Sequence, residues 1–382
     1  MAGLGKTIER LQKARRASVG PGGAVAPFIE TARFGKNPGA LRMLSYVPLG
    51  VEPGAPLVVV LHGCSQTAAA HAQSAGWVTL AERYGFALIA PEQSPQNNPN
   101  RCFNWFEPED IRRGKGEAAS IRSMVDHAVA RHDLDPRRVY VTGLSAGGAM
   151  TSVMLAAYPD VFAGGAVVAG LPHGVADNMQ GAFGAMQGAA RRSAIALGEL
   201  VRQAAPAGSN PPRVSVWHGD ADSTVRASNG EQVALQWADV HGLSESPSET
   251  LSSPGRTQRL WRAPDGEVLV EAHVVHGLGH GTPISTKGPE GLGSAAPFML
   301  EAGVSAPLEI ARFWGLAPAA AIQESQTVNS SVLEGELLGP EDEVAEPPAG
   351  VGAQVMAALS GHVDDKVGAI IAGALKSAGL LR

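Results

Sequence analysis

Short apolar runs recur along the chain and alternate with segments of helical pattern. LVVVLHG (57–63) and FALIAP (86–91) are almost continuously apolar, which is typical of strands buried on both faces of a sheet. A helical pattern, AGWVTLAERYG (75–85), lies between these two runs. Helical segments near 117–131 and 147–157 alternate with the later strand-like runs, which are RVYVTG (138–143), GGAVVAG (164–170), RVSVWHG (213–219) and VLVEAHVV (268–275). This alternation predicts an α/β fold with a mostly parallel central sheet and helices on both faces.

An antiparallel hairpin is predicted ahead of these strands. The extended stretches ETARFG (30–35) and LRMLSYVP (41–48) flank Asn37-Pro38-Gly39, whose residue types favour a turn. We expect this hairpin to form the edge of the sheet.

Composition divides the chain into a central domain and peripheral parts. Residues 1–28 are expected to form a basic amphipathic helix followed by a loop. Residues 29–317 are expected to form the α/β domain. Within that domain, residues 174–212 exceed an ordinary connection and predict a helical insertion, or lid, over the functional site; a plain surface excursion is the alternative. Residues 318–350 hold seven acidic residues, several prolines and neither Lys nor Arg, which is typical of a linker. Residues 351–382 predict a C-terminal amphipathic helix.

The C-terminal helix has apolar residues at intervals of three and four. Its polar face carries as many acids as lysines, which disfavours binding to an anionic membrane surface. We expect it to pack onto the α/β domain or to join a second copy of the chain in a homodimer.

Charge and hydropathy exclude several classes of function. The net charge of −6 and the lack of clustered Lys and Arg outside the N-terminal segment argue against nucleic-acid binding. No apolar run approaches the ~18 residues of a membrane-spanning helix. The N-terminus lacks the apolar core and cleavage site of a secretory signal, so the sequence by itself predicts a cytoplasmic location.

The chain has two cysteines, Cys64 and Cys102. Two cysteines are too few for the four-ligand site of a structural zinc ion built from cysteine. On their number alone, one disulfide and two free buried thiols are equally acceptable interpretations.

The strongest motif is Gly143-Leu144-Ser145-Ala146-Gly147, which matches G-x-S-x-G. It follows an apolar strand and opens a helix, and this context favours a serine nucleophile on a sharp strand-to-helix turn. Such a turn needs very small neighbours, because the serine backbone is strained and its hydroxyl must stand clear of the sheet.

A serine nucleophile of this type is followed along the chain first by an acid and then by a histidine. RVSVWHG leads directly into two acids, and the spacing HGxxDxxV favours Asp222 as the group that orients the histidine, with Asp220 capping the loop.

Eleven histidines compete for the role of the base. Six precede Asp222 and are disfavoured by the order: His62, His71, His127, His132, His173 and His218. His280 lies between two glycines in the loop after the last long strand, where its ring could reach Ser145; His276 is the second choice.

The oxyanion hole of such a site needs two backbone N–H groups. One is expected from Ala146, directly after the nucleophile. The other is expected from the loop after LVVVLHG, at Cys64, where His62-Gly63 lets the backbone turn towards the serine.

Taken together, the motifs resemble those of the polyhydroxybutyrate depolymerase family of esterases, which includes feruloyl and acetylxylan esterases. The resemblance covers roughly residues 40–314 and rests on several motifs in the family's order: LHGCSQT (61–67), APEQS (90–94), NRCFNWF (100–106), GKGEAASI (114–121), RRVYVTGLSAGGAM (137–150), YPDVFAGGAVVAGLPHGVA (158–176), HGDADSTV (218–225) and GLGHGTP (277–283).

The resemblance implies an α/β-hydrolase fold, a Ser145/His280/Asp222 triad, oxyanion donors at Cys64 and Ala146, and neither a metal nor an organic cofactor. It also implies that Cys64 pairs with Cys102. Trp105, Asn104 and Phe103 would contact substrate, with Phe106 beside them, although core packing explains such aromatic residues about as well. The resemblance and the disulfide together favour a secreted or periplasmic location.

The expected activity is ester hydrolysis through an acyl-enzyme, with 3-hydroxyalkanoate oligomers as the preferred substrate class. Feruloyl or acetyl esters of plant polysaccharide are the first alternative, since the same triad serves both. A non-catalytic scaffold with a hydrolase fold is the alternative from another class.

Overall fold

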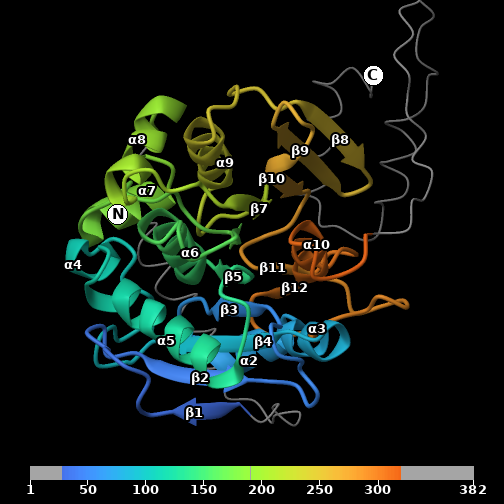
Figure 1. Ribbon diagram of the computed structural model, residues 1–382. Helices are drawn as coiled ribbons and strands as arrows, with labels where there is room; N and C mark the ends of the chain where they lie inside the picture. The colour runs from blue at the N-terminus through green and yellow to red at the C-terminus, as the bar shows by residue number, and fades with distance from the viewer. Residues whose placement is uncertain (1–27, 190, 320–382) are drawn as a thin grey trace, which may run out of the picture. The chain divides into compact units, whose positions relative to one another are not determined.

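A ten-stranded mixed sheet runs through the part of the protein that the computed structural model describes, residues 28–189 and 191–319 (Figure 1). The strand order is β1-β2-β4-β3-β5-β6-β7-β10-β9-β8. The strands are β1 (Ile29–Thr31), β2 (Arg42–Tyr46), β3 (Leu57–Leu61), β4 (Ala87–Glu92), β5 (Val139–Leu144), β6 (Gly164–Val168), β7 (Arg213–Gly219), β8 (Glu249–Ser253), β9 (Arg256–Arg262) and β10 (Val268–Val275).

The six apolar runs of the sequence form β3, β4, β5, β6, β7 and β10, and all six strands are parallel. Alternate residues of β3 face opposite cores: Leu57, Val59 and Leu61 enter one apolar cluster, and Val58 and Val60 enter the other. The predicted α/β fold with a mostly parallel sheet is therefore confirmed.

Helices cover both faces of the sheet. On one face α5 (Gly116–His132), α6 (Ala146–Ala157), α8 (Ala194–Ala204) and α9 (Ser228–Val240) bury apolar side chains; α3 (Trp77–Tyr84) and α10 (Ala306–Phe313) do so on the other. The shorter helices are α2 (Ala68–Ser74), α4 (Pro108–Ile111) and α7 (Met179–Met186). None of the helices in this part is long and apolar enough to cross a lipid bilayer.

Antiparallel strands extend the sheet at both edges. The predicted hairpin is present, since β1 pairs antiparallel with β2 at one edge. At the other edge β9 pairs with β10 and β8 pairs with β9, both antiparallel. A separate small sheet joins β11 (Thr282–Ile284) to β12 (Met299–Glu301).

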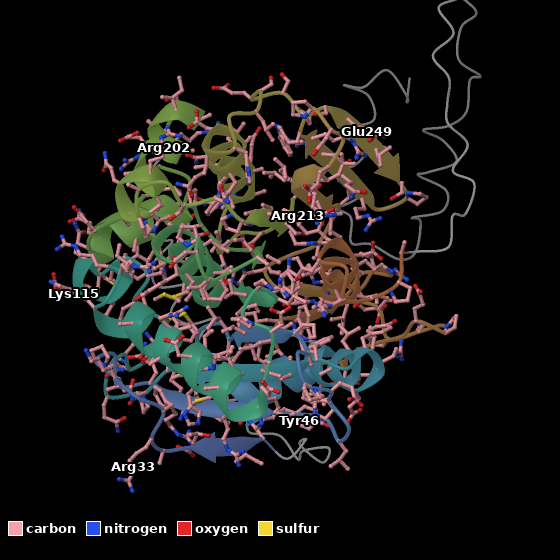
Figure 2. All side chains as sticks on the ribbon, in the orientation of Figure 1. Arg33, Tyr46, Lys115, Arg202, Arg213 and Glu249 are labelled. Carbon is pink, nitrogen blue, oxygen red and sulfur yellow. A yellow bond between two sulfur atoms is a disulfide. The ribbon has the colours of Figure 1, made fainter. Side chains whose placement is uncertain are left out.

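Charged side chains lie mainly at the outside, as the labelled Arg33, Lys115 and Arg202 illustrate (Figure 2). Many of them form ion pairs there, for example Arg202 with Asp239 at 2.8 Å. The predicted N-terminal helix, the acidic linker at 318–350 and the C-terminal helix with its possible dimer contact lie outside the described residues, apart from the last residue of the first and the first two of the second.

Candidate active site

Ser145 stands at a sharp turn between β5 and α6. Its backbone has φ 59° and ψ −118°, a conformation that residues other than glycine rarely adopt. The flanking glycine is required, because a Cβ on Gly147 would lie 2.4 Å from the carbonyl oxygen of Leu61. The backbone N–H of Ser145 donates to the carbonyl of Val168 in the neighbouring strand, so the turn is fixed to the sheet.

His280 bridges Ser145 and Asp222. Its Nε2 lies 2.9 Å from Ser145 Oγ, and its Nδ1 lies 2.7 Å from Asp222 Oδ2. The Asp222 side chain is fully buried and only 8% of the His280 side chain is exposed. The three residues expected to act as nucleophile, base and orienting acid are thus in hydrogen-bond contact at the carboxyl ends of β5 and β7.

The surroundings of Asp222 favour its ionised form. Its Oδ1 accepts the backbone N–H groups of Thr224 and Val225, at 2.8 and 2.9 Å. Burial by itself would raise the pKa of this carboxyl, but hydrogen bonds from His218 and His280 outweigh burial and lower the pKa below its usual range. An ionised Asp222 can hold one tautomer of His280.

The two competing residues, Asp220 and His276, pair with each other. His276 Nδ1 lies 2.9 Å from Asp220 Oδ2, and roughly half of each side chain is exposed. Asp220 also accepts the N–H of Gly277, at 2.7 Å. This pair ties the loop after β7 to the loop after β10, and neither residue is hydrogen-bonded to Ser145.

Ala146 directly follows Ser145, and Cys64 lines the same small hollow as the serine, so both residues expected to supply oxyanion donors lie beside it. In the loops and turns that the structure describes, no backbone carbonyl accepts from either N–H. A small hollow of about 10 Å³ lies next to the serine and is lined by Gly63, Cys64, Leu144, Ser145, His280 and Phe298. Its volume suits a single oxygen atom of a bound substrate.

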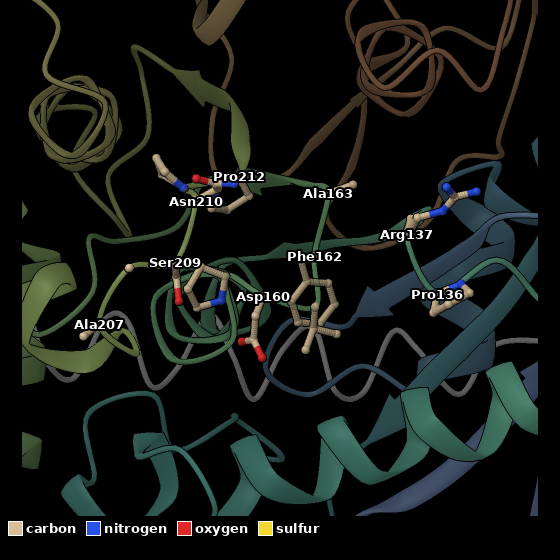
Figure 3. A pocket seen from close by; sticks show the side chains of 13 residues that line it. Pro136, Arg137, Asp160, Phe162, Ala163, Ala207, Ser209, Asn210 and Pro212 are labelled. Atoms are coloured by element: carbon tan, nitrogen blue, oxygen red, sulfur yellow. The ribbon is translucent and has the colours of Figure 1, made fainter.

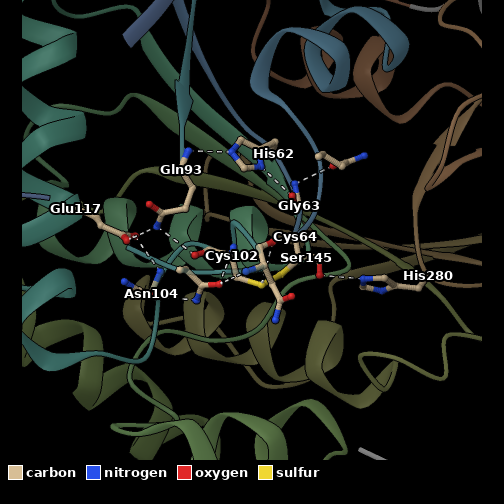
Figure 4. Close-up of a disulfide and its surroundings, with 12 residues drawn as sticks. His62, Gly63, Cys64, Gln93, Cys102, Asn104, Glu117, Ser145 and His280 are labelled. Carbon is tan, nitrogen blue, oxygen red and sulfur yellow. Dashed lines mark hydrogen bonds between the residues drawn. A yellow bond between two sulfur atoms is a disulfide. The ribbon is translucent and has the colours of Figure 1, made fainter. Parts of the chain in front are cut away.

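Cys64 and Cys102 form a disulfide next to the serine (Figure 4). The pairing that the family resemblance implied is confirmed, and free thiols are excluded for both residues. The bond joins the loop after β3 to the segment 100–106.

A cavity of about 400 Å³ opens beside Ser145. Trp105 and Phe106 line it together with Cys64, Asn98, Pro99, Asn100, Cys102, Ser145, Ala146, Leu171, Met179, Ala182, Phe183, Met186 and Val225. Most of these side chains are apolar, so the cavity suits an apolar portion of a substrate.

Two of the three residues expected to contact substrate lie outside this lining. Phe103 is fully buried and packs against His62, with ring centroids 5.0 Å apart. Asn104 donates from its side chain to Asp110 and from its backbone to Glu117. Only Trp105 of the three faces the cavity.

The segment 174–212, expected to form a helical insertion over the site, contains α7, which forms one wall of the cavity; the sequence interpretation named none of the α7 residues individually. Met179, Ala182, Phe183 and Met186 recur at spacings of three and four, which places them on one helix face. This spacing could have indicated a helix that lines the cavity, but the same spacing is found in a helix that packs on a hydrophobic core.

A larger hollow of about 570 Å³ lies at the opposite ends of the strands (Figure 3). Its lining includes Arg137, Ala163 and Pro212, which precede β5, β6 and β7. Ligands of parallel α/β sheets bind at the carboxyl ends of strands, where Ser145 and Asp222 lie, so we place the candidate active site there.

Among the described residues no group of three or more His, Cys, Asp and Glu side chains is placed to hold a metal ion.

Comparison with known proteins decides the family. The family model described as esterase PHB depolymerase matches residues 42–256. The poly(3-hydroxyalkanoate) depolymerase C of Paucimonas lemoignei is 42% identical over 295 residues, which cover 77% of this chain and 71% of that protein. The chain belongs to the esterase PHB depolymerase family. It is therefore a carboxylic ester hydrolase, as the motifs predicted.

Other relatives of the chain are named for different esters. The acetylxylan esterase of Coprinopsis cinerea is 34% identical over 259 residues, 66% of this chain and 68% of that protein. The feruloyl esterase B of Thermothelomyces thermophilus is 33% identical over 268 residues, 68% of this chain and 90% of that protein. Among solved structures, an acetyl xylan esterase from Aspergillus awamori matches with a TM-score of 0.65 at 24% identity, over 76% of this chain and all of that one. The structural match confirms the hydrolase fold.

Proposed function

We propose that the protein hydrolyses esters of 3-hydroxyalkanoates, in particular soluble oligomers, with Ser145 as nucleophile, His280 as general base and acid, and Asp222 as the orienting acid. The observation that carries this proposal is the hydrogen-bonded series Ser145–His280–Asp222 at the mouth of the apolar cavity.

In the acylation step Ser145 Oγ attacks the ester carbonyl while His280 Nε2 takes the hydroxyl proton. The tetrahedral oxyanion is stabilised by the N–H groups of Cys64 and Ala146. Collapse of this intermediate breaks the ester bond, and His280 returns the proton to the departing alcohol.

In the deacylation step water attacks the acyl-enzyme with His280 again accepting a proton. Collapse of this second intermediate breaks the bond between the acyl carbon and Ser145 Oγ, His280 returns the proton to that oxygen, and the acid is released. Asp222 stays ionised throughout and stabilises the imidazolium of His280.

The 3-hydroxyalkanoate class is supported by the 42% identity to a poly(3-hydroxyalkanoate) depolymerase and by the apolar cavity, which is larger than an acetyl group requires. An aryl substrate is the second candidate, because the cavity is lined by three aromatic rings, those of Trp105, Phe106 and Phe183, and a feruloyl esterase is 33% identical.

The test compares hydrolysis of 3-hydroxybutyrate oligomers and methyl ferulate by the purified protein, with Ser145→Ala as the blank. Serine-dependent release of hydroxybutyrate with little cleavage of ferulate is expected. The reverse preference would assign the protein to aryl esters, and hydrolysis that survives Ser145→Ala would refute the assigned nucleophile.

A further inference from the structure

Glu117 is a buried carboxyl group that the proposed reaction does not use. It lies in the first turn of α5 and is 1% exposed. One carboxyl oxygen accepts from Gln93 Nε2, and the other accepts the backbone N–H of Asn104 at 2.9 Å. Burial, together with the nearby Asp110 carboxyl, raises the pKa of Glu117 to about 8. A carboxyl group buried at this cost in solvation calls for an explanation.

The first connection from Glu117 to the active site passes through the disulfide. Gln93 Nε2, which contacts Glu117, also donates to the carbonyl of Cys102 at 3.1 Å. Cys102 is covalently joined to Cys64. Glu117 therefore holds the segment to which the proposed oxyanion loop is bonded (Figure 4).

The second connection passes through His62. The backbone N–H of Gln93 donates to His62 Nε2 at 3.1 Å, so Nδ1 carries the proton and donates to the carbonyl of Gly63 at 2.8 Å. This carbonyl and the N–H of Cys64 belong to the same peptide group. Because a trans peptide is planar, its C=O and N–H point in opposite directions. Fixing the Gly63 carbonyl therefore fixes the direction of the Cys64 N–H.

From these contacts we propose that Glu117 is a positioning residue for ester hydrolysis, which acts through Gln93 to aim the N–H of Cys64 at the oxyanion. The inference rests on the proposed function, in which Cys64 supplies that donor. Glu117 touches neither Ser145 nor His280 in this arrangement, and its effect on the reaction passes through the peptide group of Gly63 and Cys64.

The chemistry of the contacts explains why an acid occupies this position. Both neighbours, Gln93 Nε2 and the N–H of Asn104, are donors. A carboxyl group offers a lone pair from each oxygen, whereas a glutamine at 117 would turn its own NH₂ group towards one of these donors. Gln93 cannot rotate its amide to compensate, since its Oε1 already accepts from the N–H of Ser94 and from Asn97 Nδ2.

The primary test is Glu117→Gln in the full chain, assayed with p-nitrophenyl butyrate. We expect kcat per titrated active site to fall about 10- to 100-fold with KM within about 2-fold, because only the transition state carries the oxyanion. The inhibition constant of phenylboronic acid, which forms a tetrahedral adduct on the serine, is expected to rise by a similar factor.

Glu109→Gln is the matched control. This glutamate lies nearby on α4, is 69% exposed and pairs with Lys115 at 2.8 Å. The same chemical change there is expected to leave kcat and the boronate inhibition constant within about 2-fold of the wild-type values.

Gln93→Asn is measured in parallel because Glu117→Gln could fail to fold. Gln93→Asn shortens the side chain that connects Glu117 to Cys102 and leaves the Glu117 carboxyl in place. The same fall in kcat is expected. If Glu117→Gln folds, an unchanged kcat together with an unchanged boronate inhibition constant would overturn the inference, and so would an effect on KM alone. If Glu117→Gln does not fold, the same results for Gln93→Asn would overturn it. Activity retained by Ser145→Ala would instead refute the proposed function.

Discussion

The Oγ of Ser145 lies 2.9 Å from the Nε2 of His280, although 135 positions separate the two residues in the chain. Parallel strands make this approach possible, because the loops after β5, β7 and β10 all emerge at the same edge of the sheet. The base therefore reaches the nucleophile from a loop that the sheet, rather than the local sequence, puts in place.

Asp222→Asn is expected to lower kcat about 10³- to 10⁴-fold while the protein stays folded. The amide cannot hold the tautomer of His280 whose Nε2 accepts the serine proton. The measurement is kcat for p-nitrophenyl butyrate, with Asp220→Asn as control. Asp220 contacts His276 and Gly277 instead, so its variant should remain within about 3-fold of the wild type. The opposite ranking would show that the acid has been misassigned.

Replacing both cysteines by serine is expected to lower stability and activity together. The disulfide closes a loop with a sequence separation of 38, and loss of such a bond lowers the free energy of unfolding by about 2–5 kcal/mol. Loss of kcat should accompany it, since Cys64 carries a proposed oxyanion donor. Urea unfolding and kcat of the double variant measure both effects. An unchanged unfolding midpoint would contradict the structural part of this prediction.

Ala182→Phe is expected to shift the substrate range towards small acyl groups. Ala182 is buried in the cavity wall formed by α7, and a phenyl ring there would occupy space beside Ser145. We expect kcat/KM for 3-hydroxybutyrate oligomers to fall at least about 10-fold and that for p-nitrophenyl acetate to stay within about 3-fold. Ala189→Phe, at an exposed position just after α7, is the control. Equal losses on both substrates would argue against a role for this wall in selection.

The stability of the protein is expected to depend on pH through Glu117. Its pKa of about 8 in the folded protein exceeds the usual value of 4.5, so between these values the folded state binds a proton that the unfolded state releases. This contribution is fully present below pH 4.5 and is lost as the pH rises through 8. The wild type should therefore lose stability relative to Glu117→Gln between pH 6 and pH 9, as followed by urea unfolding. A difference that does not change with pH would contradict the raised pKa.

Burial on both faces explains why the core strands could be predicted. β3 and β4 are buried along their whole length, and this leaves a continuous apolar run in the sequence. β8 has the sequence ETLSS and is largely exposed at the edge, so neither an apolar run nor an alternating pattern marks it. The antiparallel extension formed by β8 and β9 was missed for this reason.

Motif context and chain order were sufficient to choose Ser145, Asp222 and His280 as the proposed triad. The structure brings these three residues together. Neighbouring aromatic residues are harder to assign. Phe103 and Trp105 lie two positions apart in an irregular segment, yet one packs on His62 and the other faces the cavity. The role of Glu117 could not be predicted from the sequence, because its partners are Gln93, directly after β4, and Asn104 in the segment 100–106, and only the folded chain brings them together.

The central claim is that Ser145 drives hydrolysis of hydroxyalkanoate esters. The most direct measurement is the release of 3-hydroxybutyrate from its oligomers by the wild type and by Ser145→Ala, side by side with methyl ferulate and p-nitrophenyl butyrate. We predict hydrolysis of the oligomers and of the p-nitrophenyl ester by the wild type, little cleavage of ferulate, and loss of at least about 10³-fold in the variant. Full activity of Ser145→Ala, or a wild type that is silent on all three esters, would contradict the account.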